Sequence, residues 1–126
     1  MKKVIVVATL IFGAVFSINA QDKQTSEIIS LEQTPGEFTQ KEITVSPGTY
    51  VFAIHNNEVG HDVGFVLVEK GKDVSKPENH IQTAYVTKAV ANGKTQRSKP
   101  TVLKTGTYLY FCPLNPTAID NELVVK

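Results

Sequence analysis

The residues with the clearest chemical potential lie near the end of the chain, around its only cysteine. Cys112 ends a run that opens with a turn glycine, Gly106, and continues through aromatic and β-branched or aliphatic residues to position 111, a pattern typical of a strand. Pro113 and Pro116 follow and stiffen a short loop that also contains Asn115. A thiol can bind a soft metal ion or act as a nucleophile. Because Cys112 has no disulfide partner within the chain, the open alternatives are metal binding, reactivity, simple burial and a bond to another chain.

The first 20 residues are typical of a bacterial secretory signal peptide. Two lysines follow Met1, residues 4–16 are apolar, and a polar segment with small residues ends at Ala20. The apolar segment is shorter than the roughly 20 residues that cross a bilayer, which argues against a membrane anchor. No cysteine lies near the predicted cleavage site, so a lipoprotein anchor is excluded. We therefore predict cleavage after Ala20 and a periplasmic or secreted protein with no membrane span.

Residues 21–126 are predicted to form one domain, since 106 residues suffice for one modest core. Without the predicted signal peptide, 11 basic residues stand against 12 acidic ones. This near-neutral balance gives no support for binding to nucleic acid or to an anionic membrane, and we expect a monomer. One group of basic residues is expected to form a solvated face, with a docking patch as the alternative: Lys94, Arg97, Lys99 and Lys104.

The spacing of short apolar segments predicts an all-β fold. No segment repeats its apolar residues with the 3.6-residue period of a helix over several turns. Turn sequences such as Pro35-Gly36, Pro47-Gly48 and Asn92-Gly93 separate the segments. Strands are predicted at residues 27–32, 38–45, 49–56, 63–68, 101–103, 106–112 and 123–125, with another short one within 81–90. This pattern favours an antiparallel sandwich or barrel, and we expect a single Greek-key β-sandwich.

Three parts of the sequence resemble the small blue-copper cupredoxins, such as plastocyanin, pseudoazurin, amicyanin and azurin. The first is the turn Pro47-Gly48 with the strand that leads to Asn56. The second is His61-Asp62 at the start of an apolar strand, and the third is the segment from Gly106 to Pro116 with the C-terminal strand after it. The resemblance covers almost the whole predicted mature chain. It implies a copper ion held by two imidazoles, one thiolate and a weak axial thioether.

Carried over to this chain, the resemblance assigns His61 as the first imidazole ligand and Cys112 as the thiolate. Asn115 stands where the second histidine is expected, which leaves a weak or vacated ligand position. The axial position falls on Ile119, which is not a ligand, or on Asp120 if the loop residues are counted differently. We therefore expect a degenerate type 1 site with one copper ion, held through His61 and Cys112.

This interpretation predicts an exported cupredoxin-like protein that transfers electrons or carries copper, with a redox or copper-donor protein as its partner. The alternative is the same sandwich without metal, serving as a structural or protein-interaction module. Neither His55 nor His80 is expected to replace the missing histidine, because both are interpreted as surface residues. We expect no enzyme activity, since no catalytic motif is present and nothing indicates an oxyanion hole beside Cys112.

Overall fold

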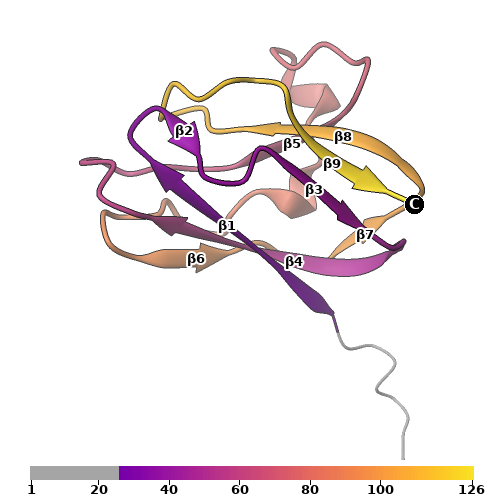
Figure 1. Ribbon diagram of the computed structural model, residues 1–126, viewed down its shortest axis with the longest axis horizontal. Coiled ribbons are helices and arrows are strands. Elements are labelled where there is room, and N and C mark those ends of the chain that lie inside the picture. Colours follow the sequence, from indigo (N-terminus) through magenta and orange to yellow (C-terminus); the bar gives the residue numbers. More distant parts are fainter. Residues whose placement is uncertain (1–25) are drawn as a thin grey trace, which may run out of the picture.

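The computed structural model describes residues 26–126, and the predicted signal peptide at residues 1–20 lies outside them. Two β-sheets pack face to face, and the chain crosses between them at both ends (Figure 1). The predicted all-β sandwich is therefore confirmed. Among the described residues, no helix is both long enough and apolar enough to cross a membrane.

The first sheet contains the N-terminal strand. Its strands are β1 (Glu27–Thr34), β2 (Glu37–Phe38), β4 (Gly48–Asn56), β6 (Thr95–Arg97) and β7 (Thr101–Leu103). They follow the order β2-β1-β4-β6, and β7 pairs with the start of β4. β1 runs parallel to β4 and pairs with it over most of its length.

The second sheet contains the cysteine strand. Its order is β3 (Glu42–Val45), β9 (Asn121–Val125), β8 (Gly106–Phe111) and β5 (Val66–Glu69). β8 is antiparallel to both of its neighbours, whereas β3 runs parallel to β9. The expected antiparallel sandwich is thus a mixed one. The reason is that β3 crosses to the second sheet, and the chain then returns in β4 to lie beside β1 in the same direction.

Some element ends differ from the prediction. The segment 38–45 is divided between β2 and β3, because the chain changes sheets there. In place of the strand predicted within 81–90, the structure has the 3₁₀ turn η3 (Gln82–Ala84) and single bridges at Val86 and Val90. Another 3₁₀ turn, η2 (Pro77–Asn79), lies in the connection before it.

An aromatic cluster fills the space between the sheets. The ring centroid of Phe65 lies 4.9 Å from that of Phe52 and 6.1 Å from that of Phe38. Phe38 also meets Tyr110 edge to face at 5.0 Å. All four side chains are buried, and aromatic pairs of this kind add about 0.5–1.5 kcal/mol each beyond the area they bury. β8 therefore turns the face that carries Tyr110 toward the core.

The hydroxyl of Tyr110 makes stability sensitive to alkaline pH. It donates a 2.6 Å hydrogen bond to the carbonyl oxygen of Gln40, and burial raises the pKa of Tyr110 to about 12. In the unfolded chain a tyrosine ionises near pH 10. Between about pH 10 and 12 the unfolded chain loses this proton while the folded one keeps it, so the stabilisation is complete below pH 10 and declines as pH rises toward 12.

We expect Tyr110→Phe to cost about 1 kcal/mol at neutral pH, because the Gln40 carbonyl loses its donor. Above pH 10 the melting temperatures of the variant and the parent protein should converge. Thermal unfolding from pH 8 to 12 measures this. A constant difference between the two melting temperatures across that pH range would contradict the assignment.

Four connections meet at one end of the sandwich, on the left of Figure 1. They are the β1–β2 turn, the loop after β4, the turn before β6 and the loop after β8. Backbone hydrogen bonds join them: the amide of Asn57 donates to Gln33, and the amide of Gly93 donates to Asn56. The amide of Gly36 donates to the side chain of Asn115. The loop that follows Cys112 is therefore held against the β1–β2 turn.

Candidate metal centre

Cys112 is buried at the end of the sandwich where the four connections meet, and its sulfur accepts hydrogen bonds from three N–H groups. The backbone amides of Gly64, Leu114 and Asn115 donate to Sγ at 3.3, 3.4 and 3.2 Å. Only 4% of the residue is exposed. N–H dipoles that converge on one atom favour negative charge there, as a metal-bound thiolate carries. The sulfur environment therefore suits a thiolate ligand.

Two of these donors belong to a closed ring of hydrogen bonds. The carbonyl oxygen of Gly64 accepts a 2.8 Å bond from Nε2 of Gln33. Oε1 of Gln33 accepts a 3.2 Å bond from Nδ2 of Asn115. The amides of Asn115 and Gly64 both return to the sulfur of Cys112. The ring links β1, the segment before β5 and the loop after β8, so it fixes the sulfur from three directions.

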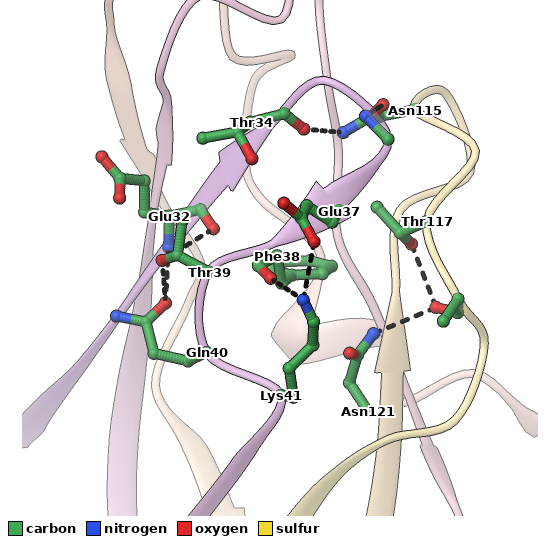
Figure 2. A network of polar contacts seen from close by, with 12 residues as sticks. Glu32, Thr34, Glu37, Phe38, Thr39, Gln40, Lys41, Asn115, Thr117 and Asn121 are labelled. Carbon is green, nitrogen blue, oxygen red and sulfur yellow. Dashed lines mark hydrogen bonds and ion pairs between the residues drawn. The ribbon is translucent and has the colours of Figure 1, made fainter.

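The side chain of Asn115 also fastens this loop to the β1–β2 turn. Its Nδ2 donates a 2.9 Å bond to the carbonyl oxygen of Thr34, as Figure 2 shows. Its Oδ1 accepts a 2.8 Å bond from the amide of Gly36. Since a carbonyl only accepts and an amide N–H only donates, these partners fix the orientation of the side chain. With both Nδ2 protons used and 1% of the residue exposed, the Asn115 amide is committed to structure.

Further contacts hold the loop between β8 and β9. The amide of Cys112 donates to Oγ1 of Thr117 at 3.1 Å. The Nδ2 atom of Asn121 donates to the carbonyl oxygens of Tyr110 and Ala118, each at 3.0 Å. Together with the two prolines, these bonds set the path of the loop.

His61 lies in an exposed loop at the same end. Its Nδ1 atom is 2.9 Å from the carbonyl oxygen of Asp62, an atom that can only accept, so Nδ1 carries the proton. In the neutral imidazole this leaves the lone pair on Nε2, the usual arrangement for a metal ligand. Three residue steps separate His61 from Gly64, so their Cα atoms lie within about 11 Å of each other.

The remaining predicted positions lie toward solvent. Ile119 is 54% exposed, and Asp120 is also exposed. Neither residue is enclosed beside the buried sulfur. Within residues 26–126, no group of three or more His, Cys, Asp or Glu side chains is arranged to hold a metal ion.

The other two histidines have partners of their own. Nδ1 of His55 is 2.8 Å from Oγ1 of Thr95, on the outer face of the first sheet. His80, which is half-buried like His55, has Nδ1 2.6 Å from the Tyr85 hydroxyl and Nε2 2.8 Å from the carbonyl oxygen of Val74. The structure therefore brings Cys112 and Asn115 together, and the three N–H groups on the sulfur come from none of the three histidines.

Gln33 is the site residue that the sequence analysis missed. It is fully buried, although a glutamine near the end of a strand usually lies at the surface. The signal that could have identified it is its position in the strand alternation. Ile29, Leu31 and Gln33 are spaced by two residues, so all three face inward along β1. A polar residue that continues an apolar stripe predicts a buried amide with partners, and here those partners are Gly64 and Asn115.

The donors present can be compared with those that type 1 copper requires. That centre takes a thiolate and two imidazoles as strong ligands. Cys112 supplies the thiolate and His61 a free imidazole nitrogen, whereas the Asn115 amide is consumed by Gln33, Thr34 and Gly36. The residues therefore do not fit a type 1 centre.

Comparison with solved structures identifies the fold. Auracyanin B shares 19% sequence identity and superposes with a TM-score of 0.65, over 86% of this chain and 93% of that one. Auracyanin A, a "blue" copper protein from Chloroflexus aurantiacus, shares 24% identity with a TM-score of 0.57, over 81% and 100% of the two chains. A reduced amicyanin variant shares 17% with a TM-score of 0.51, over 79% and 82%. With identities this low, these superpositions show a shared fold and nothing beyond the fold.

A comparison of the sequence with family profiles gives the assignment. No curated protein matches the chain. The profile described as "Copper binding proteins, plastocyanin/azurin family" matches residues 27–125, which include every strand of both sheets. Copper binding, and electron transfer more generally, are the functions associated with this group. The chain belongs to the plastocyanin/azurin family of copper-binding proteins.

Proposed function

We propose that the protein is exported and binds one copper ion through the Cys112 thiolate, with Nε2 of His61 as the second donor. The site is a degenerate one, in which Asn115 leaves the second imidazole position vacant and Ile119 supplies no axial ligand. Copper bound in this way supplies either a one-electron couple or a transferable ion. The protein therefore carries copper or electrons to and from a redox or copper-donor protein, and it catalyses no reaction.

The observation that carries this proposal is the convergence of three N–H groups on one buried sulfur, in a chain of a copper-binding family. A thiolate and a neutral imidazole are ligands that suit Cu(I). The hydrogen bond from Nδ1 of His61 to Asp62 supports the second donor, because it leaves Nε2 free. Export rests on the sequence of residues 1–20, and a periplasmic or secreted location follows from it.

The test is copper retention by the purified mature protein. We expect one equivalent of Cu(I) to remain after desalting, and Cys112→Ser to abolish it. His61→Gln should weaken Cu(I) binding by at least about tenfold in a chelator competition, because one of two donors is lost. His55→Gln is the matched control and should leave it unchanged, since His55 lies on the outer face of the first sheet. Failure to retain copper in either oxidation state would overturn the proposal.

A second candidate function is a metal-free structural or protein-interaction module. The observation that favours it is the saturation of the Asn115 amide, which lets the loop keep its path without an ion. The same experiment distinguishes the two functions. A protein that is fully folded and retains no copper, with a Cys112→Ser variant of equal stability, would support this second function.

A further inference from the structure

The acidic and basic residues of this chain are segregated. Between Glu78 and Asp120 the sequence contains no aspartate or glutamate, although it contains five basic residues. Four of these lie near one another along the chain and are all exposed: Lys88, Lys94, Arg97 and Lys99. We call these four residues the basic edge.

The basic edge follows β6, which forms one border of the first sheet. Arg97 lies opposite Ala53 of β4, and the amide of Thr87 donates to the Arg97 carbonyl, which places Lys88 along the outer side of β6. The three ion pairs among the described residues are those of Lys41, Lys70 and Lys72. Within this part of the chain, the four residues of the basic edge are therefore free of ion pairs.

One end of the basic edge lies beside the His61 loop. The carbonyl of Lys94 accepts from the amide of Asn56, and the side chain of Asn92 accepts a 3.0 Å bond from the amide of Gly60. On the other side of the His61 loop, Val63 exchanges both backbone hydrogen bonds with Val90, which lies two residues from Lys88. In Figure 1, β6 begins at the left end of the sandwich, where the loops gather. A molecule bound along β6 would thus reach His61.

We propose that the basic edge is the docking surface for an acidic protein partner. Exposed cations with no internal counter-ion attract a surface of opposite charge and accelerate its encounter. The position beside His61 would bring such a partner to the proposed copper site, and this part of the inference rests on the proposed function. The docking itself depends only on charge.

A compact acidic protein fits this surface better than a long polyanion does. Outside the basic edge, acidic residues outnumber basic ones among the described residues, and Glu27, Glu37 and Glu42 are exposed on β1, β2 and β3. Charges beyond about 8 Å are screened at physiological ionic strength, so a partner of limited size senses the basic edge alone. A long nucleic acid would also pass over the acidic strands, which repel it.

The test is a titration of the metal-free, isotope-labelled mature protein with a short poly-L-glutamate peptide, followed by NMR. We expect amide shift changes concentrated in residues 86–99 and in the His61 loop, with affinity that falls as salt is added. Lys94→Glu combined with Arg97→Glu should weaken binding by at least about tenfold. Lys70→Glu combined with Lys72→Glu makes the same change in net charge away from β6, and it should alter affinity by less than about twofold.

Three results would overturn the inference. One is the absence of binding at low salt, and another is an equal loss of affinity in both double variants. The third is stronger binding of a DNA duplex at the same residues, which would assign the surface to nucleic acid. Because the titration uses protein without copper, its outcome is independent of copper retention. The docking surface and the proposed metal site can therefore fail separately.

Discussion

Replacing Asn115 with leucine is expected to lower the free energy of unfolding by about 3 kcal/mol, and the melting temperature by roughly 12–20 °C. Leucine branches as asparagine does and is the larger of the two, so the change removes hydrogen bonds without leaving a cavity. The carbonyl of Thr34, Oε1 of Gln33 and the amide of Gly36 all lose their partner. A buried polar group left without a partner costs about 1–3 kcal/mol.

Denaturant unfolding and thermal unfolding of the metal-free protein measure this effect. Asn92→Leu is the matched control, because Asn92 is exposed and accepts a single hydrogen bond, from Gly60. We expect the control to cost less than about 1 kcal/mol. If both variants lost the same stability, the Asn115 amide would not be the fastening between the loop and the β1–β2 turn.

The fold was largely predictable because strand alternation and turn residues are local signals. β4 and β8 follow the predicted segments closely, and the face of β8 that carries Tyr110 and Cys112 is buried. The pairing partners were not predictable in the same way. Whether β3 joins β2 or crosses to β9 depends on contacts between distant residues, and the alternation within β3 is the same in both cases.

The site was predictable only in part. The position of Cys112 at the end of a strand follows from alternation, and the structure shows that the residue is buried. The placement of His61 in an exposed loop does not follow from alternation. Val63 rather than His61 turns inward to the core, and Gly64 supplies the N–H group to the sulfur. Those facts depend on how the connection after β4 returns to β8, a path that short-range patterns do not specify.

The role of Asn115 illustrates the same limit. From the ligand count alone, an asparagine in a histidine position indicates a weakened metal site. The structure adds what the side chain does instead: it joins Gln33, Thr34 and the sulfur loop in one hydrogen-bonded unit. The departure from the family pattern therefore has a structural function of its own, and restoring the histidine has a cost.

Asn115→His is accordingly expected to destabilise the protein and to produce no blue centre. Judged by the number of ligands, this change should improve copper affinity and colour. The imidazole offers at most one donor and one acceptor when neutral, so it cannot satisfy Gln33, Thr34 and Gly36 together. We expect a loss of about 2–4 kcal/mol, which corresponds to roughly 10–20 °C in melting temperature.

The measurement is the visible spectrum of the variant after addition of Cu(II), together with its thermal unfolding. An intense thiolate-to-copper band with unchanged stability would show that the side chain at position 115 turns freely toward Cys112. In that case the ring of hydrogen bonds would be dispensable. Gly64→Ala serves as a control for crowding near the sulfur, since a Cβ there would meet Pro113 at an ordinary 3.6 Å. It should leave both stability and copper binding nearly unchanged, which separates the loss of hydrogen bonds in Asn115→His from simple steric disturbance.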